Sequence, residues 1–105
     1  MQIVDSFNRL LFAEVGTYSL EFLRPIKDLD FAYATIGLGS GICGMFAARD
    51  ALNLKTKIVE VFSAHAGAYT ELFSSGRPVE PPVSTKISDG MACRIPELSE
   101  LELIW

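Results

Sequence analysis

The sequence predicts a single α/β domain in which a short parallel sheet is flanked by helices in three layers. Two strand-like runs predict it: Phe31–Ile36 is apolar on both faces, as buried parallel strands are, and Lys57–Phe62 is a second such run. A helical pattern separates them, and two parallel strands joined by a helix form a right-handed βαβ unit. The 105 residues suffice for one small domain, 1–105, and no more.

Composition and charge exclude several classes of partner. Half of the residues are apolar, which suits a packed core. The net charge is −4 and the basic residues are scattered, so we expect no nucleic-acid partner. No apolar run approaches the roughly 20 residues of a membrane span, and no signal sequence opens the chain. Cys43 and Cys93 fit no metal-binding or redox spacing, so we expect a reduced, cytoplasmic setting.

The first helix is expected to begin after Ser6, a candidate N-cap, and to end near Leu23, before Pro25. Gly16 costs about 1 kcal/mol relative to alanine and is a candidate breakpoint. One apolar stripe with spacings of three and four residues marks the expected buried face: Phe7, Leu11, Val15, Tyr18 and Phe22.

The helix between the two strands is expected to begin in a glycine-rich turn, Gly37-Leu-Gly-Ser-Gly-Ile-Cys-Gly44, and to end near Asn53. Arg49 and Asp50 lie on its polar side. The opposite, apolar side is formed by Ile42, Met45, Phe46 and Leu52.

A third helix is expected after the second strand. Ser63 is its candidate N-cap, and Gly76, followed by Pro78, is its candidate C-terminal cap. Residues 77–88 are interpreted as a loop, and residues 97–104 as a weak helix or the end of a strand. The buried side of the third helix is marked by Tyr69, Leu72 and Phe73.

Three interpretations of the glycine-rich turn stay open. It is a plain strand-to-helix turn, a dinucleotide site or a phosphate cup. A dinucleotide site needs G-x-G-x-x-G, and Ile42 occupies the third glycine position, although Glu60 lies where a ribose-binding acid would. In a phosphate cup, the backbone amides from Leu38 to Ile42 and the Ser40 hydroxyl bind one phosphate at a helix N-terminus.

Several linked motifs resemble the threonine/serine dehydratase group of fold-type-II pyridoxal-phosphate enzymes. The glycine-rich turn is similar to the tetraglycine-type phosphate loop of that family, and especially to the loop of the dehydratase-like proteins of hydroxyectoine breakdown. Four further segments resemble family motifs: Gly16-Thr-Tyr-Ser-Leu-Glu21, Ala48-Arg-Asp-Ala-Leu52, Ser75-Gly-Arg-Pro-Val79 and Ile87-Ser-Asp-Gly-Met-Ala92. The resemblance covers nearly the whole chain but only the middle of the family's large cofactor domain.

This resemblance implies pyridoxal 5'-phosphate as the cofactor and β-elimination of an amino acid, with release of ammonia and a keto acid, as the family activity. It implies that Asp89-Gly90 forms a wall of the cofactor pocket. The cofactor phosphate would be bound by Gly37, Leu38, Gly39, Ser40, Gly41 and Ile42.

Other family features are missing from the sequence. The Ser-x-Lys-x-Arg-Gly motif, whose lysine bonds covalently to the cofactor aldehyde, is not found, so no catalytic residue is assigned. Where some members bind a divalent cation after the second strand, the side-chain ligands are replaced by Phe62 and Ala68, so we expect no metal site. His65 is interpreted as a surface or capping residue and Cys43 as a packed residue rather than a nucleophile.

The sequence thus predicts a fragment or truncated homologue of a dehydratase that is inactive alone. Two alternatives stay open. One is a non-catalytic module that binds a phosphate-bearing ligand. The other is an interaction module, because a part of a larger sheet exposes apolar edges and faces, which a homo-oligomer would cover.

Overall fold

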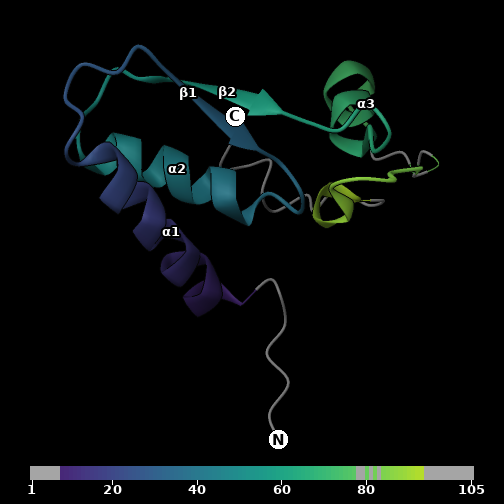
Figure 1. Ribbon diagram of the computed structural model, residues 1–105, viewed down its shortest axis with the longest axis horizontal. Coiled ribbons are helices and arrows are strands. Elements are labelled where there is room, and N and C mark those ends of the chain that lie inside the picture. Colours follow the sequence, from purple (N-terminus) through teal and green to yellow (C-terminus); the bar gives the residue numbers. More distant parts are fainter. Residues whose placement is uncertain (1–7, 78–79, 81, 83, 94–105) are drawn as a thin grey trace, which may run out of the picture.

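Two parallel strands joined by a helix form the centre of the fold (Figure 1). The computed structural model describes residues 8–77, 80, 82 and 84–93. The α/β class, with a short parallel sheet and flanking helices, is confirmed. In chain order the elements are α1 (Arg9–Leu23), β1 (Phe31–Thr35), α2 (Ser40–Ala51), β2 (Lys57–Val61), α3 (Ala68–Ser75) and the 3-10 turn η1 (Asp89–Met91).

The two strands pair in the register that joins Phe31 to Lys57 and Thr35 to Val61. Both end one residue before the predicted boundary, although the Ile36 amide still donates to the Val61 carbonyl at 3.0 Å. Figure 1 shows α2 along the sheet and α1 against α2, with α3 beyond the carboxyl end of β2. The loop that follows β1 therefore lies at the same edge of the sheet as the segment that leads into α3.

Only one face of β1 is buried, which corrects the expectation of a strand buried on both faces. Ala32 and Ala34 lie in the core with Ile42 and Met45 of α2. The side chains on the opposite face, Phe31 and Tyr33, are 50% and 73% exposed. Since no helix described in residues 8–93 packs on this outer face, an apolar sheet surface is open to solvent.

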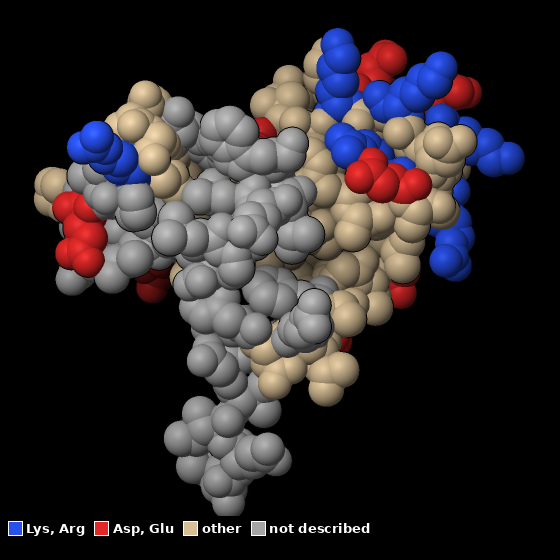
Figure 2. Space-filling model, turned by 180° about the vertical axis from the view of Figure 1, so that it is seen from behind, with Lys and Arg blue, Asp and Glu red and all other residues tan. Residues whose placement is uncertain are grey.

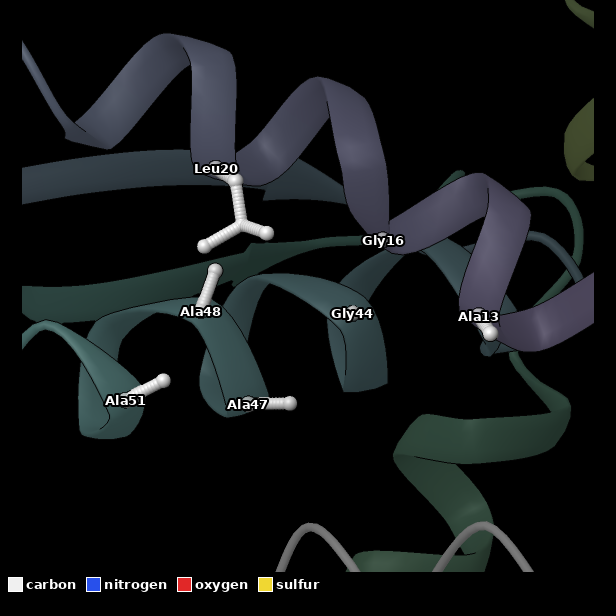
Figure 3. A pocket seen from close by; sticks show the side chains of 7 residues that line it. All are labelled: Ala13, Gly16, Leu20, Gly44, Ala47, Ala48 and Ala51. Atoms are coloured by element: carbon white, nitrogen blue, oxygen red, sulfur yellow. The ribbon is translucent and has the colours of Figure 1, made fainter.

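The α1 and α2 helices cross at two glycines, Gly16 and Gly44 (Figure 3). A Cβ atom on Gly44 would lie 2.9 Å from the Gly16 Cα atom, so the backbones approach as closely as they do because both residues lack side chains. Next to the crossing, Leu20 points toward Ala48, and small residues leave a shallow apolar groove. The helix continues through Gly16, so the candidate breakpoint was wrong: close packing offsets the low helix propensity of glycine.

The buried face of α1 differs from the predicted apolar stripe. Ser19 and Leu23 are fully buried, whereas Tyr18 and Phe22 are nearly half exposed. The glycine crossing at Gly16 explains the difference, because it turns the small-residue side of α1, rather than its aromatic side, toward α2.

The helix begins at Arg9, where the Asn8 side chain caps it by accepting from the Leu10 amide at 2.9 Å. The predicted cap, Ser6, and the first member of the stripe, Phe7, lie outside the described residues, as do the side chain of Leu11 and the predicted element at 97–104.

The third helix begins later than predicted. It starts at Ala68 after Gly67, while Ser63 closes a local turn in which its hydroxyl accepts from the His65 amide at 3.3 Å. Tyr69 and Leu72 are buried as predicted, and the side chain of Phe73 lies outside the described set. Gly76 ends the helix with φ +67°, the left-handed conformation expected of a glycine cap.

The chain was also searched for helices that could cross a bilayer. Among the residues that the structure describes, no helix has both the length and the apolar character that a membrane span requires.

Candidate phosphate-binding site

The Gly37–Ile42 segment connects the carboxyl end of β1 to the first turn of α2. Gly39 caps the helix with φ +113° and ψ −21°, a conformation that residues with a Cβ atom rarely adopt. Its carbonyl accepts the first hydrogen bond of the helix, from the Cys43 amide at 3.0 Å. The amides of Ser40, Gly41 and Ile42 therefore lie in the first turn, where no intrahelical acceptor exists.

The amides and the carbonyls of this loop have different surroundings. Within residues 8–93 as described, none of the amides from Leu38 to Ile42 donates to a protein acceptor. Two carbonyls, in contrast, accept phenol hydroxyls: Leu38 from Tyr69 of α3 and Gly41 from Tyr18 of α1, the latter at 3.3 Å. The amides thus remain available, together with the positive end of the α2 dipole, for an anion.

The η1 turn lies against the start of the loop. A Cβ atom on Gly37 would come within 2.7 Å of the Gly90 carbonyl oxygen, so the two backbones are in direct contact. The Asp89-Gly90 segment, predicted from family resemblance to line a cofactor pocket, is thereby placed beside the predicted phosphate loop. Its role toward a cofactor, and that of the six loop residues, stays a prediction.

The two candidate reactive side chains near the loop have structural surroundings. Cys43 is a buried thiol on α2. His65 is exposed before α3, where its carbonyl accepts from the Ser84 amide at 3.0 Å and its Nδ1 lies 3.5 Å from the Ser84 hydroxyl. Both arrangements agree with packing and loop-tethering roles rather than with a nucleophile and its base.

Glu60 lies on β2 opposite Ala34, whose side chain faces the core. It is partly buried, and desolvation raises the pKa of its carboxyl group. No ion pair involving Glu60 occurs in the described part of the chain. The sequence identified this acid as out of place in an apolar strand, and the structure agrees, since burial of the carboxylate is not offset there by a cation.

The basic side chains gather far from the loop. Figure 2 shows most Lys and Arg residues of that face, mixed with acidic ones, at one end of the molecule. Lys27 and Lys55 line a polar hollow there, and Lys57 begins β2 with its amine 5.6 Å from the Phe31 ring centre. The loop follows the other end of the sheet, about 13 Å away along five-residue strands.

A search for metal ligands covered the described residues only. In that part of the chain no three His, Cys, Asp or Glu side chains lie close enough together to hold a metal ion.

The pattern of large apolar residues did not reveal the role of Tyr18 and Tyr69. Both were interpreted as core-facing aromatic residues, and both hydroxyls contact the loop. A signal was present, because a buried tyrosine needs a partner for its hydroxyl and a glycine-rich turn offers carbonyls that can accept it.

Known proteins support the family resemblance over one part of their length. No family model matches the chain. It is 28% identical over 95 residues to L-threonine ammonia-lyase of Geobacter sulfurreducens, which covers 90% of this chain and 24% of that protein. The chain thus spans about a quarter of the length of the curated relative.

Solved structures share the fold. The processed form of threonine deaminase isoform 2 from Solanum lycopersicum superposes with a TM-score of 0.85 at 21% identity, covering 98% of this chain and 29% of that one. Maize serine racemase gives 0.77 at 22%, over 90% and 28% of the two chains. The threonine deaminase of T.th. gives 0.78 at 24%, over 92% and 37%. The chain therefore has the fold of one part of the fold-type-II pyridoxal-phosphate enzymes and, as its motifs predicted, resembles their threonine dehydratase group.

Proposed function

We propose that this chain binds pyridoxal 5'-phosphate by its phosphate group and does not catalyse amino-acid elimination alone. One observation carries the proposal: the amides from Leu38 to Ile42 have no protein acceptor in the described structure, while the carbonyls of Leu38 and Gly41 are occupied. A doubly charged phosphate is the ligand that such a set of amides at a helix N-terminus favours.

The loop fits a phosphate in donors and in space. The Ser40 hydroxyl can add one hydrogen bond to those of the amides. Glycine at positions 37, 39 and 41 lets an anion approach the backbone without meeting a Cβ atom. Pyridoxal phosphate, when bound, supplies the electron sink for reactions at an amino-acid carbon, and this loop would hold and orient it.

The expectation of no turnover rests on the amines. The lysine motif of the family is not found in the sequence. The described lysines Lys27, Lys55 and Lys57 lie at the beginning of the strands, opposite the loop, and Lys86 lies in the loop before η1. None of them stands where an amine beside the loop would be needed for the covalent attachment on which the chemistry depends.

The test is a titration of the pure chain with pyridoxal phosphate, followed by absorbance and by tyrosine fluorescence. Pyridoxal, which lacks the phosphate, is the matched control ligand. We expect saturable binding of the phosphate ester only, no covalent adduct after borohydride, and no ammonia from threonine or serine. Absence of saturable binding contradicts the binding proposal, and ammonia release contradicts the proposed inactivity.

A second candidate function is assembly, favoured by the outer face of β1. Phe31 and Tyr33 expose a large apolar area there, and the amide and carbonyl groups at the strand edges add a surface that pairs readily. A second copy of the chain would cover both, so we propose a homo-oligomer. Both cysteines, Cys43 and Cys93, are buried as thiols, which supports a reduced, cytoplasmic setting for either function.

A further inference from the structure

We infer that Tyr69 is a positioning residue that sets the orientation of the phosphate loop. The inference rests on the proposed function, because it concerns how the loop is prepared for a phosphate. Tyr69 lies in the first turn of α3 and is 2% exposed. Its hydroxyl donates to the Leu38 carbonyl, across 31 positions of sequence.

The ring of Tyr69 is fixed by the core. It belongs to the same cluster as Ile36 and Ile42, the residues that flank the loop on either side. A phenol held in this way has few alternative rotamers, so its hydroxyl is a fixed point rather than a flexible contact. A buried hydroxyl also needs a partner, and losing the Leu38 carbonyl would leave it in an apolar surrounding.

The geometry of the peptide unit turns this contact into an orientation of the amide. The bond between Leu38 and Gly39 is trans, as are all described peptide bonds, so its C=O and N–H groups point in opposite directions. Because Tyr69 holds the Leu38 carbonyl toward α3, the Gly39 amide points away from α3. The same relation links the Gly41 carbonyl, which accepts from Tyr18, to the Ile42 amide.

The two tyrosines differ in ways that provide a matched control. Tyr18 is 47% exposed, and its hydroxyl lies 3.3 Å from the Gly41 oxygen, so water can replace it easily. Tyr69 is buried, and water cannot take its place without a cavity. Removing the Tyr69 hydroxyl should therefore release the loop, whereas removing that of Tyr18 should change little.

The test compares Tyr69→Phe with Tyr18→Phe, using the titration with pyridoxal phosphate and a parallel one with inorganic phosphate. We expect Tyr69→Phe to weaken both affinities about tenfold, the effect of roughly one hydrogen bond, and Tyr18→Phe to weaken them less than about threefold. Circular dichroism checks that both variants are folded. If the wild-type chain does not bind, the proposed function fails. If it binds and Tyr69→Phe binds equally well, the positioning role fails.

A second variant keeps the test decisive if Tyr69→Phe does not fold. Replacing Tyr69 with 3,5-difluorotyrosine keeps the ring and hydroxyl and lowers the pKa of the phenol. Above that pKa the oxygen carries no proton and can no longer donate to Leu38. The ratio of variant to wild-type affinity should then fall as pH rises through the titration of the phenol. A ratio that is constant with pH overturns the inference.

Discussion

Gly44 of α2 faces Gly16 of α1 so closely that a Cβ atom on Gly44 would lie 2.9 Å from the Gly16 Cα atom. The reverse is not true, since a Cβ atom on Gly16 would lie 3.7 Å from the Gly44 Cα atom, an ordinary contact. The crossing therefore excludes a methyl group on one helix and accepts it on the other. Because the obstacle at Gly44 is backbone, only movement of a whole helix relieves the clash.

Gly44→Ala should thus destabilise the fold while Gly16→Ala should not. We expect Gly44→Ala to lower the free energy of unfolding by about 1–3 kcal/mol through overpacking. Gly16→Ala should leave it unchanged or raise it by up to about 1 kcal/mol, because alanine favours the helix. Urea unfolding of the two variants measures the difference. Equal effects of the two substitutions would contradict the described crossing.

The order of the elements could be predicted because glycines, prolines and apolar runs mark it locally. Gly76 ends α3, and the run from Lys57 forms β2, as local chemistry dictates. The buried face of α1 could not, since it depends on a partner 28 positions away, from Gly16 to Gly44. Large apolar residues such as Tyr18 and Phe22 then mark a face that packs on nothing in the described structure.

The candidate site could be located but not built from the sequence. The glycine spacing marks the loop, because Gly39 has to adopt a positive φ. The groups that hold the loop come from α1, α3 and η1, and no local pattern links Tyr69 to Leu38 or Gly90 to Gly37. The start of α3 was missed because Ser63 caps a turn as readily as a helix.

Alanine at Gly39 and at Gly41 should separate folding from binding. Gly39 has φ +113°, so Gly39→Ala should destabilise the fold by about 1–2 kcal/mol and also weaken phosphate binding. A Cβ atom on Gly41 would meet only the Tyr18 hydroxyl, at 3.2 Å, the end of an exposed side chain. Gly41→Ala should therefore stay folded but bind pyridoxal phosphate at least about tenfold more weakly. Unchanged binding by folded Gly41→Ala would argue against a phosphate at this loop.

Glu60 should make the fold less stable as pH rises. Burial raises the pKa of its carboxyl group, so the folded chain holds this proton more tightly than the unfolded chain. The contribution of Glu60 is thus most favourable below its ordinary pKa and is lost as pH rises through the raised value. Glu60→Gln should increase the free energy of unfolding at pH 7 and have little effect near pH 4.

The control for this substitution is Glu21→Gln, which changes an exposed carboxylate on α1. Chemical denaturation of both variants between pH 4 and pH 8 measures the effect. We expect the stability difference to grow with pH for Glu60→Gln only. A Glu60→Gln variant that is less stable than wild type at pH 7 would indicate a cation partner for this carboxylate.

The outer face of β1 should control the oligomeric state. Phe31→Thr combined with Tyr33→Thr keeps strand propensity and removes the exposed aromatic surface. We expect the wild-type chain to sediment as an oligomer at micromolar concentration and the double variant as a monomer. Ile87→Thr, which removes an apolar side chain that is exposed outside the sheet, is the control and should leave the oligomer intact. A monomeric wild-type chain contradicts the assembly proposal.

Ser19 should be a site where alanine stabilises the fold. It is fully buried on α1, and its hydroxyl has no hydrogen-bond partner in the described structure. Ser19→Ala removes this unsatisfied group and adds helix propensity, so we expect the free energy of unfolding to rise by about 1 kcal/mol. Thr17→Ala is the matched control on the same helix, since its exposed hydroxyl donates to the Glu14 carbonyl at 2.6 Å. Because both substitutions gain helix propensity, a larger gain for Ser19→Ala isolates the buried hydroxyl, and a loss of stability would show that this hydroxyl is satisfied in solution.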